Sequence, residues 1–212
     1  MHQAITRINN RLPISGQFAV SPILELSDEL FNLLNSDEQE ELSSFKNHRR
    51  KKEFVTARLM LKKMSRKMGM KEDDFIILKD EWGCPHGKYG AVNYYVSIAH
   101  TQKNVFCGIT QNTAIGVDLE PVNRTVAGKL RERILHPDEI QSFRETDTIR
   151  LWTIKEAVIK LEGRGLRMNM NEVQVQCDKN QFFVEINNDK TAKICSFQAE
   201  NNWLAVAFYH KP

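Results

Sequence analysis

The chain has 212 residues, of which 41% are hydrophobic and 27% are charged, and its formal net charge is +3. This composition is typical of a globular protein and excludes a disordered or low-complexity chain, and so small a net charge does not by itself indicate nucleic-acid binding. No apolar run approaches the roughly 20 residues of a membrane-spanning helix, and the N-terminus lacks the apolar core of a signal peptide. We therefore expect a cytoplasmic protein with no membrane and no nucleic acid among its partners.

The four cysteines are far apart in the sequence and form no CxxC pair, and they are Cys84, Cys107, Cys177 and Cys195. This spacing favours reduced thiols over a zinc site or a disulfide framework.

The first half alternates strand-like and helical patterns in a definite order. The expected segments are a strand at 17–26, a helix at 34–45 begun by a capping box of Ser36 and Gln39, a longer helix at 49–69, and strands at 74–80, 93–100 and 104–110, with a tight turn at 80–88.

The second half has the same order of segments. They are a strand at 112–121, a helix at 135–143 with Pro137 in its first turn, a longer helix at 148–163 that ends at glycine, and strands at 173–178, 181–186, 192–198 and 203–209. Three residues of the first short helix have counterparts in the second: Leu34, Asp37 and Glu38 correspond to Leu135, Asp138 and Glu139.

This internal repeat predicts an α+β protein of two similar α+β lobes, 1–111 and 112–212. We expect a pseudo-twofold axis to relate the lobes, with an active-site cleft between them, since ligand sites tend to form in such clefts. Positive charge is concentrated in the first half, at 46–52 and 61–67, and three carboxylates stand out in the second. A polyanionic ligand held between the halves is one interpretation, and a solvated basic helix face is the other.

Two carboxylates lie on one face of the strand expected at 112–121. Asp118 and Glu120 are two residues apart, so their side chains point the same way while Val117 and Leu119 pack behind them. Holding two carboxylates together is costly unless a cation such as Mg²⁺ lies between them. The alternative is a solvent-facing acidic pair at the end of a strand.

The helix expected at 148–163 has one apolar and one polar face. Leu151, Ile154, Val158 and Leu161 form the apolar stripe, and Trp152, Glu156 and Lys160 follow one another on the other side. Glu156 and Lys160 form either a surface ion pair, worth roughly 0.3–0.5 kcal/mol, or part of an active site in which Glu156 is a third carboxylate.

A histidine ends the strand expected at 93–100. His100 is either a structural or exposed residue, or a phosphate contact beside the basic helix that carries Arg49, Arg50 and Arg58.

Two long motifs resemble the paired signature of the 4′-phosphopantetheinyl transferases, namely "IGVDLE" at 115–120 and "WTIKEAVIKLEGRGL" at 152–166. Supporting segments are "FVTARLMLKKM", "EWGCP" and "SIAHT", so the resemblance covers nearly the whole chain from about Ile23. The length and the internal repeat resemble the monomeric, duplicated type named for surfactin synthetase activation.

The resemblance implies a reaction in which coenzyme A, the co-substrate, donates its phosphopantetheine arm to a serine of an apo acyl or peptidyl carrier protein and releases 3′,5′-ADP. It implies Mg²⁺, or Mn²⁺, bound by Asp118, Glu120 and Glu156. In that comparison Glu156 is the base, while Lys160 neutralises phosphate charge with help from Lys155. The second lobe thus carries the chemistry.

The first lobe is implied to hold the 3′-phosphate and adenine of coenzyme A, through His100, Arg50 and Arg58. The sequence departs from the family at two positions. Ala99 replaces a serine that contacts the phosphate, so Ser97 or backbone amides are the expected substitutes. Cys84 replaces a lysine, for which Lys88 is the nearest cation.

Two other functions remain open. A metal-dependent nuclease or nucleotidyl-transfer enzyme would use the same carboxylates, with the basic helix on nucleic acid. Nuclease sites usually place glutamate and lysine two apart on a strand, however, whereas here they are four apart on a helix. A non-enzymatic module that binds an acidic partner leaves both motifs unexplained.

Overall fold

The computed structural model describes residues 6–71, 74–126, 128–144, 147–163, 165, 168–179, 181–187 and 190–209. The chain divides into two compact units. We call them the first lobe, made by residues 1–80 and 85–111, and the second lobe, made by residues 81–84 and 112–212. Among the described residues, no helix is both long and apolar enough to cross a membrane.

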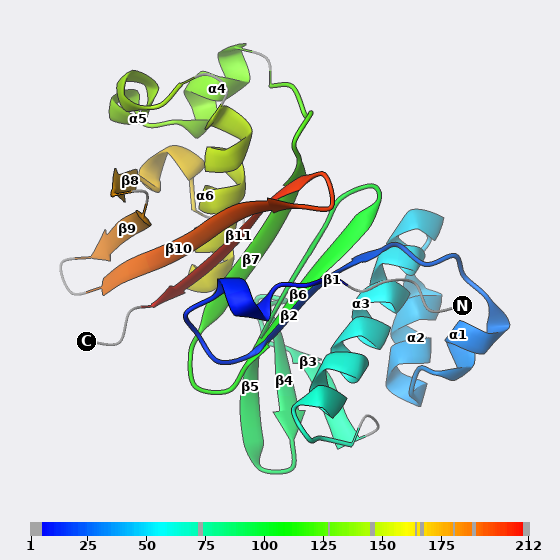
Figure 1. The fold of residues 1–212 in the computed structure, drawn as a ribbon. Coiled ribbons are helices and arrows are strands. Elements are labelled where there is room, and N and C mark those ends of the chain that lie inside the picture. The colour runs from blue at the N-terminus through cyan, green and yellow to red at the C-terminus, as the bar shows by residue number, and fades with distance from the viewer. Residues whose placement is uncertain are drawn as a thin grey trace. The chain divides into compact units, whose positions relative to one another are not determined.

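The first lobe is an antiparallel sheet of six strands in the order β1-β2-β6-β5-β4-β3, covered by helices (Figure 1). Its elements are β1 (Thr6–Arg7), a 3-10 turn (Asn9–Arg11), β2 (Gln17–Pro22), α1 (Asp28–Asn32), α2 (Ser36–Ser44), α3 (His48–Lys67), β3 (Phe75–Lys79), β4 (Pro85–Tyr89), β5 (Val92–His100) and β6 (Asn104–Thr110). Helix α3 packs on β6 and β2, with Ala57, Leu61 and Met64 in the core.

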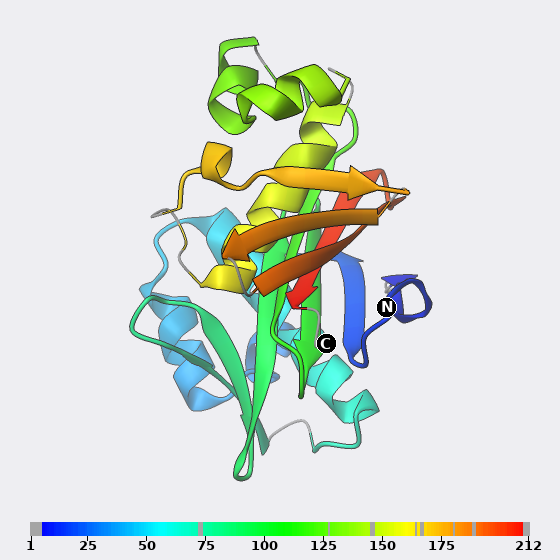
Figure 2. The same ribbon diagram turned by 90° about the vertical axis from the view of Figure 1, so that its left-hand side faces the viewer.

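The second lobe is a five-stranded antiparallel sheet in the order β7-β11-β10-β9-β8, which can be followed in Figure 2. Its elements are β7 (Ile115–Pro121), α4 (Gly128–Ile134), α5 (Pro137–Ser142), α6 (Thr148–Glu162), a 3-10 turn (Met170–Glu172), β8 (Val175–Asp178), β9 (Gln181–Asn187), β10 (Lys190–Ala199) and β11 (Asn202–Tyr209). Helix α6 lies along β7 and β11.

The two lobes share one topology, which confirms the α+β class and the likeness of the lobes. In each, the first long strand pairs with the last strand and the remaining strands follow in reverse order, with β1 as an extra edge strand in the first lobe. The short helices also match, because Asn35 with Glu38 and His136 with Glu139 form capping boxes at corresponding positions. The pseudo-twofold axis and the cleft stay predictions.

The core of the second lobe depends on a close approach of α6 to β7. The predicted apolar stripe of α6 is buried, and Leu151, Ile154 and Val158 are all 0% exposed. A Cβ atom at Gly116 of β7 would lie 1.9 Å from the carbonyl oxygen of Ala157. Glycine at 116 therefore lets the helix rest directly on the strand that carries Asp118.

Several local predictions were wrong in detail. The capping box of α2 uses Asn35 and Glu38, one residue before the expected pair, because the Asn35 side-chain oxygen accepts from the Glu38 amide at 2.9 Å. The tight turn expected at 80–88 is confined to its first part, since β4 begins at Pro85 and pairs with both β3 and β5. Gly87 serves close packing there, because a Cβ atom would lie 2.4 Å from the Phe75 ring.

Candidate active site

The candidate active site is a cluster of three carboxylates and two cations on β7, α6 and the loop after β7 in the second lobe. Asp118 and Glu120 lie two residues apart on β7, opposite Ala205 and Trp203 of β11. Glu156 and Lys160 lie one turn apart on α6, which Gly116 brings close to β7. Residues distant in the sequence therefore meet because a strand and a helix pack without an intervening side chain.

Asp118 is the most buried carboxylate of this cluster, with 6% of its surface exposed. Its Oδ1 accepts a hydrogen bond from Lys160 Nζ at 2.7 Å, whereas among the described residues its buried Oδ2 has no donor. Burial raises the pKa of Asp118 to about 7; Lys160 opposes this rise, and the negative charges of Glu156 and Glu120 add to it. The ionised form of Asp118 is therefore costly at this position.

Glu156 is half-buried and feels the same charges. Burial raises the pKa of Glu156, Lys160 lowers it, Glu120 raises it and Arg124 lowers it. The three carboxylates expected to share a site thus lie within electrostatic range of one another, with Lys160 among them.

Arg124 is a member of the cluster that sequence reasoning missed. Its guanidinium pairs with Glu120 and lies over the ring of Trp152, 4.1 Å from the ring centroid. Stacking on an aromatic face is a common use of arginine. The sequence signal was a basic residue four positions after Glu120, which does not by itself reveal the partner on α6.

A pocket of about 590 Å³ opens beside Glu156 and Lys160 in the second lobe. Most of its wall is apolar, and the wall includes Leu130, Ile134, Trp152, Ile159, Met168 and Met170. The polar side chains of its wall are Glu156 and Lys160 of α6, together with Arg133 and Asn169.

No three histidine, cysteine, aspartate or glutamate side chains form a ready-made metal site within the described part of the chain. In this structure Lys160 holds Asp118 and Arg124 holds Glu120. The chemistry of the donor set nevertheless fits a hard divalent cation, because Glu156 and Glu120 both repel the Asp118 carboxylate and, among the described residues, Asp118 Oδ2 has no donor.

Lys155 lies in the interior and not at the surface of this site, so its contact with coenzyme A stays a prediction. The side chain is fully buried, and its Nζ donates to Glu139 Oε2 at 2.5 Å, Val173 O at 2.7 Å and Met170 O at 3.0 Å. All three ammonium protons therefore have acceptors inside the protein, so Lys155 ties α6 to α5 and to the segment before β8.

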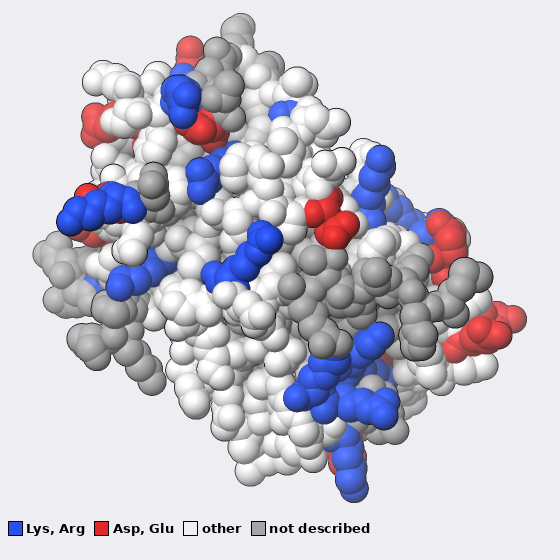
Figure 3. Space-filling model, in the orientation of Figure 1, with Lys and Arg blue, Asp and Glu red and all other residues white. Residues whose placement is uncertain are grey.

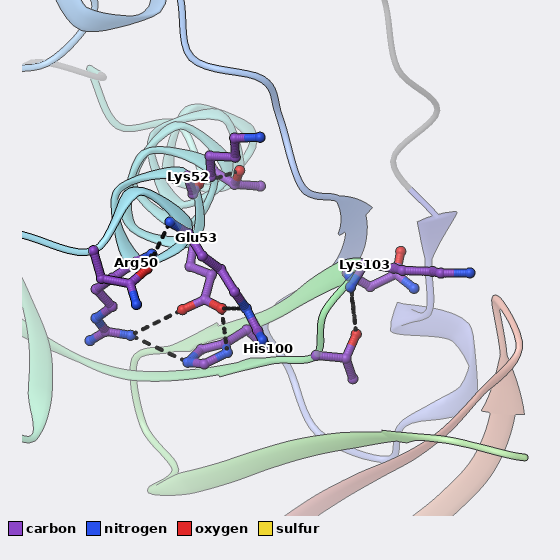
Figure 4. A network of polar contacts seen from close by, with 10 residues as sticks. Arg50, Lys52, Glu53, His100 and Lys103 are labelled. Carbon is purple, nitrogen blue, oxygen red and sulfur yellow. Dashed lines mark hydrogen bonds and ion pairs between the residues drawn. The ribbon is translucent and has the colours of Figure 1, made fainter. Parts of the chain in front are cut away.

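The residues expected to bind phosphate form a second cluster, in the first lobe. Figure 4 shows Arg50 and Glu53 of α3 pointing toward His100 at the end of β5. His100 Nδ1 lies 3.3 Å from Glu53 Oε1, and His100 Nε2 lies 3.3 Å from Arg50 Nη1. The side chains of Arg50 and His100 are 49% and 36% exposed, so this cluster is open to a ligand.

Two other residues assigned to the phosphate are buried. The Arg58 side chain is 4% exposed, pairs with Glu41 at 3.2 Å and Glu38 at 3.7 Å, and lies over the ring of Phe54. Ser97 is 5% exposed on β5. Both side chains are thus enclosed, and phosphate binding by Arg58 and Ser97 stays a prediction that their burial does not support.

The basic residues of α3 also divide by burial. Lys62 pairs with Glu38 in the interior, whereas Lys63, Arg66 and Lys67 are exposed. In the view of Figure 3 one group of basic side chains lies at the lower right, and others are scattered over the same face. For the run at 61–67, a solvated helix face is therefore the better of the two interpretations.

Cys84 lies where the family pattern has a lysine. Its thiol donates to the carbonyl oxygen of Gly163 at 3.5 Å. Gly163 ends α6 in the left-handed conformation, with φ of 67°. Cys84 thus contacts the end of the helix that carries Glu156 and Lys160.

Comparison with known proteins points to one family. Residues 114–208 match the model of the 4′-phosphopantetheinyl transferase superfamily. The chain is 25% identical over 169 residues to 4′-phosphopantetheinyl transferase gsp of Aneurinibacillus migulanus, covering 74% of this chain and 68% of that protein. It is 27% identical over 155 residues to "Putative 4′-phosphopantetheinyl transferase slr0495" of Synechocystis sp., covering 66% of this chain and 61% of that protein.

Proposed function

We propose that the chain is a member of the 4′-phosphopantetheinyl transferase superfamily, whose model its residues 114–208 match, and that it transfers the 4′-phosphopantetheine arm of coenzyme A to a serine of an apo acyl or peptidyl carrier protein. The observation that carries the proposal is the meeting of Asp118, Glu156 and Lys160, which come from the two motifs, beside an open pocket.

Asp118, Glu120 and Glu156 would hold a magnesium ion, for which manganese could substitute. Two observations support this assignment: Asp118 Oδ2 has no donor in the part of the chain that the structure describes, and Glu156 and Glu120 both repel the Asp118 carboxylate. When bound, such an ion supplies positive charge to the diphosphate oxygens during transfer.

In the reaction, the serine hydroxyl oxygen attacks the phosphorus that bears the pantetheine arm. A new P–O bond forms to serine, and the P–O bond to the adenosine part breaks, so that 3′,5′-ADP leaves with the bridging oxygen and its electron pair. Glu156 would accept the serine proton. It is half-buried and its pKa is raised, which makes its carboxylate a stronger base than an exposed glutamate.

Lys160 would neutralise the charge that develops on the leaving diphosphate. Its side chain is 30% exposed and lies at the pocket, so the ammonium group can exchange its contact with Asp118 for one with a phosphate oxygen. Lys155 has no such freedom, because it is enclosed by three acceptors.

In the first lobe, Arg50 and His100 would bind the 3′-phosphate of coenzyme A. Both side chains are partly exposed and lie 3.3 Å apart. One chain carries both groups of residues, so we expect a monomer.

The experiment that tests this function is the intact mass of a carrier protein. Purified enzyme, coenzyme A and Mg²⁺ are incubated with apo carriers from fatty-acid, polyketide and nonribosomal peptide synthesis, and mixtures without coenzyme A serve as controls. We expect at least one carrier to gain the mass of one phosphopantetheine. If the mass of every carrier stays unchanged, the proposed function is wrong.

A further inference from the structure

Glu53 is a buried carboxylate to which neither motif assigns a role. It is 5% exposed and lies on α3, one turn after Arg49. Its Oε1 accepts from Arg49 Nε at 2.8 Å, and its Oε2 lies 3.7 Å from Arg50 Nη1. A buried carboxylate needs such partners, since its desolvation is costly. Its contact with His100 has a consequence for ligand binding.

The contacts of the His100 ring determine which nitrogen carries the proton. A carboxylate only accepts hydrogen bonds, so Nδ1, which lies 3.3 Å from Glu53 Oε1, carries the hydrogen. A guanidinium only donates, so Nε2, which lies 3.3 Å from Arg50 Nη1, is the acceptor. The ring is therefore held between a fixed acceptor on one side and a fixed donor on the other (Figure 4).

We propose that Glu53 is a positioning residue that holds His100 and Arg50 as a phosphate-binding pair for the 3′-phosphate of coenzyme A. The inference rests on the proposed function, because it takes the ligand of His100 to be that phosphate. Glu53 itself is too buried to touch the ligand and acts through its neighbours.

The chemistry of the contact explains why a carboxylate is needed behind the ring. Phosphate oxygens accept hydrogen bonds, so a contact through His100 Nε2 requires a proton on that nitrogen and a positive ring. Glu53, on the Nδ1 side, compensates this charge. An uncharged side chain there removes the carboxylate that favours a proton on Nδ1 and the negative charge that Glu53 places beside the imidazolium.

The test combines a charge-removing variant with a matched control. Glu53→Gln keeps the size of the side chain and removes the charge. Glu25→Gln removes a carboxylate that pairs with Lys52 of the same helix but is 82% exposed. Binding of coenzyme A and of 3′-dephospho-coenzyme A is measured by calorimetry, which does not depend on transfer activity.

We expect Glu53→Gln to weaken coenzyme A binding at least about tenfold while leaving 3′-dephospho-coenzyme A unchanged, and Glu25→Gln to change neither. Because Glu53 acts partly through His100, the same substitution should change coenzyme A affinity less in a His100→Ala background than in the wild type. Equal coenzyme A binding by wild type and Glu53→Gln, or fully additive effects, would overturn the proposal.

A spectroscopic readout separates positioning from loss of fold. In the ¹⁵N spectrum of the imidazole groups, with the His100 signal identified by its absence from His100→Ala, the wild type should show the Nδ1–H tautomer and Glu53→Gln a smaller fraction of it. An unchanged tautomer contradicts the inference. If Glu53→Gln does not fold, Glu53→Asp, which keeps the charge but shortens the reach, should give the same losses in smaller measure, and full retention of the phosphate preference would overturn it.

These outcomes are distinct from those of the function itself. If the wild type modifies a carrier but binds both forms of the coenzyme equally, the Glu53 proposal fails and the transferase function stands. If no carrier is modified yet Glu53→Gln selectively loses coenzyme A affinity, the function fails and the positioning role stands.

Discussion

Helix α6 carries two lysines, Lys155 and Lys160, each of which pairs with a carboxylate of another element. The two pairs have the same chemistry but differ in structure. Lys155 meets Glu139 in the core, where His136 N and Val175 N also donate to Glu139, so the partners of both side chains are complete. Lys160 meets Asp118 at a pocket, where one oxygen of Asp118 has no donor among the described residues. The comparison teaches that completeness of hydrogen bonding, rather than residue type, separates a structural pair from a reactive one.

The largest expected effect is on the transfer reaction, and it follows from a change of Glu156 beside the Lys160–Asp118 pair. Glu156→Gln should lower transfer by roughly 10²- to 10⁴-fold, because the serine loses its base. Thermal stability should be equal to or above that of the wild type, since burial and Glu120 raise the pKa of Glu156 and the neutral amide removes that cost. Transfer rates and melting curves measure the two effects, and near-normal turnover would show that Glu156 is not the base.

The next effect follows from breaking the buried Lys155–Glu139 pair. Lys155→Met should destabilise the protein by about 3–5 kcal/mol, because it leaves the Glu139 carboxylate buried without its cation. This corresponds to a fall in Tm of roughly 6–20 °C for a protein of this size. Adding Glu139→Gln should recover much of the loss, and the folded double variant should transfer at near the wild-type rate. A selective loss of coenzyme A affinity in that variant would restore a ligand-binding role to Lys155.

A smaller effect tests whether the close approach of α6 to β7 positions the Lys160–Asp118 pair. Gly116→Ala places a methyl group against the backbone of Ala157, so α6 must shift, at a cost of about 1–3 kcal/mol. We expect the folded variant to lose transfer activity more than stability, because the shift separates Asp118 from Glu156 and Lys160. Unchanged kcat in a destabilised variant would show that the close approach serves packing alone.

The smallest effect concerns pH. The folded pKa of Asp118 is raised to about 7 from an unfolded value near 3.9, so the stability present below the unfolded pKa is lost as pH rises toward 7. Without divalent cations, Asp118→Asn should escape this loss and be more stable than the wild type at pH 8 by roughly 1–2 kcal/mol. Denaturant titrations at pH 4 and pH 8 measure it, and a constant difference between the two proteins contradicts the assignment.

The elements and motifs of the second lobe could largely be predicted from the sequence. The apolar stripe of α6 defines its buried face, and the alternation around Asp118 defines a strand, because both patterns depend on local periodicity. The equivalence of Glu38 and Glu139 was also visible, since both follow the same leucine and aspartate at the same spacing.

The partners of these side chains could not be predicted, because spacing defines a face of a helix and not what covers it. Lys155 lies next to Glu156 in sequence but points into the core, where Glu139 is 16 residues away in the chain. The contact of Arg124 with Trp152 likewise requires the fold to bring a loop and a helix together. Glu53 went unnoticed among lysines because its burial arises from the sheet beneath α3.

We propose that Asp118, Glu156 and Lys160 carry out the transfer. The most direct test of this proposal is the rate of carrier modification by three proteins at equal folded concentration. Intact mass is followed over time with coenzyme A and Mg²⁺ for the wild type, Lys160→Ala and the Lys155→Met/Glu139→Gln double variant. We expect the wild type and the double variant to modify the carrier at similar rates, and Lys160→Ala to modify little of it. Equal rates for the wild type and Lys160→Ala would contradict the role of this cluster in the transfer.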